Sequence, residues 1–344
     1  MTWLKNIFGD NEEGAKPEPV RNRPAAPADV VRLESELGVK FPASLVRMYT
    51  ETDGVNEPDA RSWEVFRLMP LREVADINGR IAQRGMAAMA KRYSMVCFWA
   101  DDQANYAGVF CGVFLDGRVF FLDHEGPYLG DFSPVFRSVE SFQAHLDEAA
   151  ERNRIIEYFE TGEITAEALE AHASRFTWYR HCAPKDASTW DCLPVDYRSL
   201  PAEYSENDRA TFRECLKRVE GKTFDLGGER DFLVYSLARL VPPEEISTLF
   251  PYLGVDHMWI PARIAKILVL RDCPEAIPHL VTLALSCNRN CRNAAKCSLS
   301  KMIWQTPEAQ GAIKALYSRQ GGDFAEIQAN LQTLQGSPSL IYQW

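Results

Sequence analysis

Strand-forming residues fill most of the segment from Met95 to Glu125. It reads MVCFWA (95–100), DDQAN (101–105), YAGVFCGVFL (106–115), DG (116–117), RVFFL (118–122) and DHE (123–125). Runs of β-branched and aromatic residues separated by short acidic breaks are typical of strands. Asp-Gly between two such runs favours a two-residue hairpin turn, because both central positions of that turn need positive φ. We therefore predict an antiparallel sheet in which a strand over 106–115 pairs with a strand over 118–122.

Both faces of the predicted 106–115 strand are apolar. Side chains alternate between the two faces of a strand. One face therefore carries Ala107, Val109, Cys111, Val113 and Leu115, and the other carries Tyr106, Gly108, Phe110, Gly112 and Phe114. Two arrangements fit this pattern: helices cover both faces, or one face is partly kept for a partner.

Helical periodicity surrounds these strands. Apolar residues at spacings of three and four predict helices over 28–37, 43–50, 70–89 and 135–146. Gly38 stands in the position of a helix C-cap. Alternation from Trp63 to Leu68 predicts a further strand.

The final third of the chain contains a repeat. Pro243-Glu244-Glu245, Pro274-Glu275-Ala276 and Pro307-Glu308-Ala309 recur 31 and 33 residues apart, with apolar residues at matching offsets after each. Three two-helix units of this length predict an α-solenoid, which resembles the HEAT type. The predicted organisation is a flexible lead-in over 1–27, an α+β domain over 28–160, a connector over 161–204 and an all-α HEAT-like domain over 205–344.

Composition indicates an ordinary globular protein of two domains. The chain has 344 residues, of which 46% are hydrophobic and 25% are charged. No run approaches the ~20 apolar residues of a membrane helix, and the N-terminus lacks the order of a secretory signal. We expect a cytoplasmic protein without a membrane partner. Nine cysteines, an odd number, favour reduced thiols over a disulfide framework.

The net charge of −10 argues against a nucleic-acid partner, for which a basic surplus is the usual sign. The acidic surplus lies in the first half, because residues 1–160 hold 26 acidic and 18 basic side chains. Such a domain suits a basic partner, for example a nuclease with a cationic cleft. The alternative is that the charge only keeps the protein soluble.

Residues 28–148 resemble the SUKH superfamily, a domain shared by fungal cell-wall assembly regulators and many bacterial immunity proteins. The matching features are LGVKFP (37–42) leading into Leu45 and Tyr49, Asp53-Gly54, WADD (99–102), the Asp116-Gly117 hairpin with Val119, DHE (123–125) and the closing helix over 138–146. The resemblance implies an α+β fold, an antiparallel sheet with flanking helices, that acts by binding another protein.

Catalytic and metal-binding motifs are not recognisable in the sequence. Nucleophile elbows, Walker loops, Rossmann glycines and zincin helices are missing, so we expect neither an enzyme nor a cofactor. His181, Cys182 and Cys192 are the best metal candidates. Zinc sites need four ligands, commonly paired two to four residues apart, so we expect no metal there either.

Acidic residues cluster at the predicted strand ends: Asp101, Asp102, Asp116, Asp123, Glu125 and Asp131. Three uses are open: solvated turn formation, acid–base or cation chemistry, and a negative rim that steers a basic toxin. A basic helix carries Arg289, Arg292, Lys296 and Lys301 without aromatic residues for base stacking. It is either a solvated face or a second contact for an acidic partner.

The resemblance implies an immunity protein that neutralises a cognate secreted toxin, either polymorphic or delivered by contact or type VI secretion, by occluding its active surface. The candidate contacts are Asp101, Asp102, Asp123 and Glu125 for charge, with Trp63, Tyr106 and Phe110 as aromatic anchors. One alternative is a non-catalytic scaffold or regulator in cell-envelope or signalling assembly. Another is an enzyme whose site lies among the acids.

Overall fold

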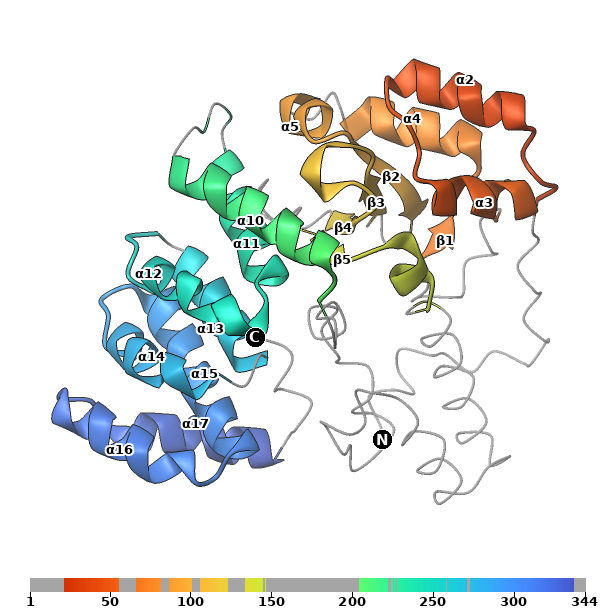
Figure 1. Cartoon of the computed structure of the whole chain (residues 1–344). Coiled ribbons are helices and arrows are strands. Elements are labelled where there is room, and N and C mark those ends of the chain that lie inside the picture. Colours follow the sequence, from red (N-terminus) through yellow and green to blue (C-terminus); the bar gives the residue numbers. More distant parts are fainter. Residues whose placement is uncertain are drawn as a thin grey trace, which may run out of the picture.

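The computed structural model describes residues 22–55, 66–81, 87–100, 106–122, 134–144, 146, 204–221, 224, 226, 228–257, 259–270 and 273–336. In these residues an antiparallel sheet lies between a group of N-terminal helices and a longer series of C-terminal helices (Figure 1). The predicted antiparallel sheet with flanking helices is confirmed, and so is a helix-rich C-terminal half. The predicted connector lies almost entirely outside the described residues.

Two short helices open the described chain where the sequence predicts them. They are α2 (Pro27–Leu37) and α3 (Ala43–Glu51). Gly38 ends α2 with a φ of 68°, a conformation that glycine adopts without steric cost. The buried carboxylate of Glu34 accepts a 2.8 Å hydrogen bond from the backbone N–H of Phe41, which fixes the corner between the two helices.

The sheet has five antiparallel strands that lie side by side in chain order. They are β1 (Arg67–Leu68), β2 (Met95–Ala100), β3 (Tyr106–Phe110), β4 (Val119–Leu122) and β5 (Pro134–Phe136). Both edge strands are short. Where β1 does not reach, Asn78 closes the edge of β2: its side-chain amide accepts from the N–H of Cys97 and donates to the C=O of Cys97, both at 2.9 Å. These bonds leave less open backbone for edge-to-edge pairing.

The strand predicted over 106–115 is too long. β3 ends at Phe110, and a 3-10 turn, η2 (Val113–Leu115), follows it. Asp116 has φ −48° and ψ 132°, whereas Gly117 has φ 77°. These are the angles of a type II turn, in which only the second central residue needs positive φ. The Asp-Gly signal for a turn is therefore right, but the predicted two-residue hairpin loop is wrong.

Two predicted helices also differ from the structure. The helix predicted over 70–89 is found as α4 (Leu71–Ile81) and α5 (Ala87–Arg92), separated by residues outside the description. The helix predicted over 135–146 starts later, because β5 pairs with β4 before helical residues begin at Val139. Cross-strand pairing overrides the local helical period here.

Helices cover both faces of the sheet. Alternation places Phe121 of β4 on one face and Phe110 of β3 on the other. On the first face, the ring of Phe142 lies 5.6 Å from that of Phe121. On the second, the ring of Phe232 from α11 (Glu229–Leu240) lies 6.0 Å from that of Phe110. The first of the two predicted arrangements is therefore the one observed.

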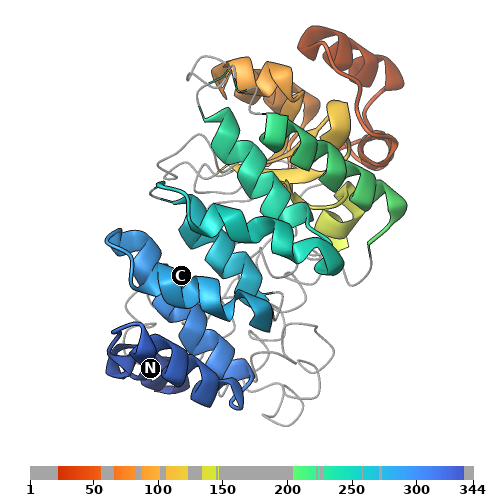
Figure 2. The same cartoon turned by 60° about the vertical axis from the view of Figure 1, so that its left-hand side comes forward.

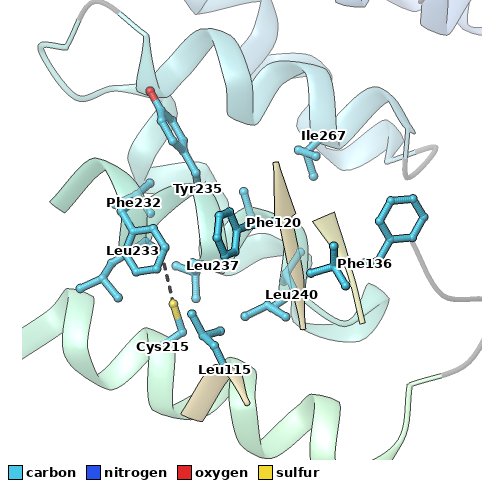
Figure 3. Packing of buried hydrophobic residues seen from close by; sticks show 14 of the residues in the cluster. Leu115, Phe120, Phe136, Cys215, Phe232, Leu233, Tyr235, Leu237, Leu240 and Ile267 are labelled. Carbon is cyan, nitrogen blue, oxygen red and sulfur yellow. Dashed lines mark hydrogen bonds between the residues drawn. The ribbon is translucent and has the colours of Figure 1, made fainter. Parts of the chain in front are cut away.

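The second face is closed by α11 together with α10 (Glu206–Gly221), which pack against each other. Cys215 of α10 donates a 3.2 Å hydrogen bond to the backbone C=O of Leu233 in α11. Phe120 of β4 and Leu115 of the η2 turn point into the same apolar layer (Figure 3). The sheet and the first C-terminal helices therefore share one core.

The remaining helices form two adjoining layers (Figures 1 and 2). They are η4 (Pro243–Leu249) continuing into α12 (Phe250–Leu253), α13 (Ile260–Leu270), η5 (Pro274–Ala276) continuing into α14 (Ile277–Ala284), α15 (Arg289–Gln305), α16 (Ala309–Arg319) and α17 (Phe324–Gly336). In one layer α12 contacts α14 and α14 contacts α16; in the other, α11, α13, α15 and α17 contact in succession. None of the helices in the described part of the chain is long and apolar enough to cross a membrane.

Candidate functional site

Most of the predicted contact residues lie outside the described residues. These are Trp63, Asp101, Asp102, Asp123 and Glu125. The strands on either side of them are described, and the register of these strands shows which strand residues lie side by side where the undescribed segments begin or end.

Four strand residues meet across one end of the sheet. Arg67 of β1 pairs with Ala100 of β2, Ala100 pairs with Tyr106 of β3, and Tyr106 pairs with Leu122 of β4. The chain passes from these positions, or from within a few residues of them, into the segments that hold the predicted contacts. We name the row Arg67, Ala100, Tyr106 and Leu122 the free sheet end.

The two predicted anchors that the structure describes have different environments. Tyr106 lies in the free sheet end and is partly exposed. Phe110 lies at the other end of β3, has no exposed surface, and packs against Phe120 and Phe232. The prediction that Phe110 anchors a partner is therefore wrong, because α11 already occupies the face on which its ring lies.

An aromatic pair that the sequence reasoning missed lies beside the free sheet end. Phe66 directly precedes β1, and its ring stacks on Phe121 with centroids 5.3 Å apart and planes 7° apart. Phe66 is only partly buried. Phe66 belongs to the segment 63–68 that the alternation predicts as a strand, and that pattern was the signal that could have identified it.

Polar contacts hold the backbone next to the free sheet end. The guanidinium of Arg67 donates to the C=O of Val55 at 3.0 Å and to the carboxylate of Glu73 at 2.8 Å. The carboxylate of Asp53 accepts from the N–H of Leu71 at 2.9 Å, which satisfies a donor at the start of α4. These hydrogen bonds therefore fix the position of the described backbone next to the segments that hold the predicted contacts.

Asp116 is the one predicted strand-end acid that the structure describes. The residue is exposed, but partial desolvation of its carboxyl raises the carboxyl pKa, and a hydrogen bond from the backbone N–H of Gly117 partly offsets this rise. It lies at the end of the sheet opposite to the free sheet end, beside the η2 turn that contacts α10. It is therefore not part of the same cluster as the other acids.

The opposite end of the sheet is held to the C-terminal helices by buried charges. Arg118 donates a 2.7 Å hydrogen bond to Asp208 of α10, and both side chains are at most 10% exposed. Arg92 and Tyr93 contact the carboxylate of Glu229 at 2.9 and 2.6 Å. We name these five residues the polar seam. Sequence reasoning missed it, because no local pattern links residues 90 to 136 positions apart.

The described residues include buried cysteines and residue types that can bind metal ions. Burial raises the pKa of the Cys97, Cys111 and Cys215 thiols far above the ordinary value, which disfavours the nucleophilic thiolate. The described part of the chain contains no group of three or more His, Cys, Asp or Glu that could hold a metal ion. The three metal candidates of the sequence analysis, His181, Cys182 and Cys192, lie outside the described residues.

The predicted basic helix is α15, and its charges differ in environment. Arg289 is exposed, and Lys296 pairs with Glu326 of α17. Lys301 is only 6% exposed. The helix is therefore not uniformly a solvated face.

Residues 24–160 match the SMI1 / KNR4 family (SUKH-1). No curated protein and no solved structure matches the chain. The match includes the sheet and the free sheet end, and it stops before α10. The N-terminal half of this chain therefore carries a domain of the SUKH superfamily.

Proposed function

We propose that this protein is a cytoplasmic immunity protein that binds a cognate secreted toxin and occludes its active surface. The observation that carries this proposal is the SUKH-1 match over residues 24–160. Immunity proteins are one of the two functional groups that the superfamily resemblance brings with it. The toxin, polymorphic or delivered by contact or type VI secretion, is the protein partner of this proposal.

The free sheet end is the contact surface in this proposal. α11 fills the face that carries Phe110, and the helix containing Phe142 covers the other face. A partner therefore meets the end of the sheet more readily than either face. Tyr106 and Phe66 supply partly exposed aromatic surface there, and aromatic residues carry much of the energy of protein interfaces.

The acidic side chains of the segments leaving this end set the electrostatics of the proposed contact. The segments hold Asp101, Asp102, Asp123 and Glu125, and the only Lys or Arg in residues 101–125 is Arg118. Arg118 is paired with Asp208 inside the polar seam. A negative rim of this kind accelerates association with a basic toxin more than it slows dissociation.

The helices of the C-terminal half have a supporting role in this proposal. We propose that they form a HEAT-like stack, in which each Pro-Glu turn begins a two-helix unit and neighbouring units bury a continuous core. Such a stack adds rigid surface beside the domain. Neutralisation by covering needs no catalytic step, and we propose that the chain is not an enzyme.

Co-expression tests this proposal. A candidate secreted effector, taken from a reading frame next to that of this chain, is expressed in a bacterial host with and without the full chain, and viable cells are counted. We expect the chain to restore growth and to co-purify with the effector. A chain that binds an envelope or signalling component but gives no protection is instead a scaffold, the alternative function.

Charge variants then locate the contact. Asp101→Asn with Asp102→Asn, and Asp123→Asn with Glu125→Gln, should each slow association with the toxin about tenfold or more at low salt. Asp116→Asn is the matched control, because Asp116 is exposed at the opposite end of the sheet. Equal association rates for all three variants would remove the free sheet end from the proposal.

A further inference from the structure

Helices of the C-terminal half begin with side-chain caps. At the start of α15, the carboxamide oxygen of Asn288 accepts from the backbone N–H of Asn290 at 3.0 Å and of Cys291 at 3.2 Å. At the start of α17, a carboxylate oxygen of Asp323 accepts from the N–H of Ala325 at 3.0 Å. Asn and Asp are among the residues that commonly cap helices in this way.

The corresponding position before α13 is occupied by a histidine. His257 lies 31 residues before Asn288, which is also the spacing between the first two Pro-Glu turns of the repeat. Nδ1 of its imidazole accepts from the backbone N–H of Trp259 and from that of Ile260, both at 3.2 Å. His257 therefore caps α13 as Asn288 caps α15.

These hydrogen bonds assign the protonation state of the imidazole. A ring nitrogen that accepts a hydrogen bond carries no proton, so the proton of the neutral ring lies on Nε2. Nε2 lies 3.2 Å from a carboxylate oxygen of Asp231 in α11. The neutral ring of His257 therefore connects the start of α13 to α11.

The backbone of His257 makes a further connection, to α15. Its C=O accepts from the side-chain amide of Asn288 and from the thiol of Cys291, both at 3.5 Å. Burial raises the pKa of the Cys291 thiol, so this donor keeps its proton. We name the contacts of His257 with α11, α13 and α15 the helix junction.

The charged side chains at the helix ends that meet here have defined environments. Asp231 is the one in contact with the imidazole. Arg263 of α13 lies over the ring of Tyr235, and Arg292 of α15 donates to the C=O of Ser286. Three further charges are exposed and one lies in the polar seam: Arg230, Asp256, Arg289 and Glu229.

We propose that the helix junction is a pH-sensitive switch, in which a neutral His257 caps α13 and a protonated His257 leaves that cap and pairs with Asp231 of α11. Imidazole is the side chain that ordinarily changes charge between about pH 5 and 8. A proton on Nδ1 removes the acceptor of two backbone N–H groups and places positive charge at the positive end of the α13 dipole. This inference does not depend on the proposed function.

The switch should act locally. The proton that removes the cap of α13 also strengthens the attraction between the ring and the carboxylate of Asp231. The two effects oppose each other in the free energy of unfolding. Acid should therefore change which helix the ring of His257 holds more than it changes the stability of the whole chain.

The neighbouring repeat supplies the matched variant. The carboxamide of Asn288 caps α15 in the same way and does not titrate. His257→Asn therefore keeps an acceptor for the two capped N–H groups at every pH. His279→Asn is the control for loss of an imidazole, because His279 lies exposed on α14.

Amide hydrogen exchange of the full chain tests the inference. Protection of the Trp259 and Ile260 N–H groups, corrected for their intrinsic exchange rates, is measured at about pH 8 and about pH 5. We expect acid to lower this protection about fivefold or more in the native chain and in His279→Asn, as for the loss of a helix cap. In His257→Asn the protection should stay constant.

A further variant separates titration of the ring from titration of the carboxylate. In Asp231→Asn a carboxamide oxygen still accepts from Nε2–H, so the acid response should persist. The native chain and Asp231→Asn decide the question even if His257→Asn fails to fold. The inference is overturned by protection that does not fall in the native chain, that falls equally in His257→Asn, or that no longer falls in Asp231→Asn.

Discussion

The hydroxyl of Tyr93 donates a 2.6 Å hydrogen bond to the carboxylate of Glu229, 136 residues further along the chain. Glu229 is 1% exposed and stands at the first position of α11. Burial and this bond to a carboxylate raise the pKa of Tyr93 well above its ordinary value, so the phenol stays protonated as the donor. One buried acid thus joins the SUKH domain to the helices that follow it.

Replacement of Glu229 should lower the free energy of unfolding, because it removes the polar contacts between the SUKH domain and the start of α11. Glu229→Ala leaves the Arg92 cation without its carboxylate and the Tyr93 hydroxyl without its acceptor. We expect a loss of about 3 kcal/mol in the free energy of unfolding, measured by urea denaturation. Tyr93→Phe should cost about 1 to 2 kcal/mol. Additive losses in the double variant would show that the two groups do not interact.

The Arg118–Asp208 pair should make stability depend on acid pH. Burial alone raises the pKa of Asp208, but hydrogen bonds from Ser205 and Arg118 outweigh it, and the pKa lies below its ordinary value. The carboxylate therefore contributes stability above its unfolded pKa of about 3.9, and this contribution is lost as the pH falls through the folded pKa.

Two variants check this pair. Arg118→Met leaves Asp208 as an uncompensated buried charge and should cost about 3 to 5 kcal/mol at neutral pH. In Asp208→Asn the decline in stability below about pH 4 should be shallower than in the native chain. Urea midpoints measured from pH 3 to 7 decide this, and parallel curves for the native chain and Asp208→Asn would contradict the assignment.

Tyr106 and Phe110 should respond to substitution in opposite ways. Phe110→Ala empties a fully buried site between β3 and α11 and should cost about 3 to 5 kcal/mol of stability. Tyr106→Ala should cost much less stability but weaken toxin binding by about 2 kcal/mol. Thermal unfolding and calorimetric titration with the toxin separate the two effects. A Tyr106 variant that binds normally would exclude this side chain as an anchor.

Two glycines with similar backbone angles offer a matched comparison. Gly38 and Gly54 have φ of 68° and 72°, but a Cβ at Gly38 meets open space, whereas one at Gly54 would lie 2.6 Å from the backbone at Leu68 to Pro70. Gly38→Ala should cost about 1 to 2 kcal/mol from conformational strain. Gly54→Ala should cost clearly more, because backbone must also move. Equal Tm values for the two variants would contradict this packing.

Sequence patterns predicted those helices, strands and turns whose structure depends on residues close together in the chain. Gly38, the helices around it and the strands on either side of Asp116-Gly117 follow from spacing and turn residues. The position at which β3 ends was not predicted, because the residues of η2 are as apolar as those of the strand but do not pair with another strand. β5 was mistaken for helix, because its pairing with β4 depends on a distant partner.

The candidate site was predictable only in part. Alternation placed Tyr106 and Phe110 on one face of β3 but carried no information about what covers that face. The covering helix, α11, lies more than a hundred residues later, and the seam partners Asp208 and Glu229 lie 90 and 136 residues after Arg118 and Tyr93. Lys301 was visible as a basic residue in a helix, but its burial depends on the packing of α13 against α15.

We propose that this chain acts by covering a toxin. The activity of a purified candidate effector is measured while the purified full chain is titrated into it. We predict that activity falls to zero at a stoichiometric ratio and that a stable complex elutes from a sizing column. Full effector activity in the presence of excess chain, with no complex formed, would show that this chain does not act by covering that toxin.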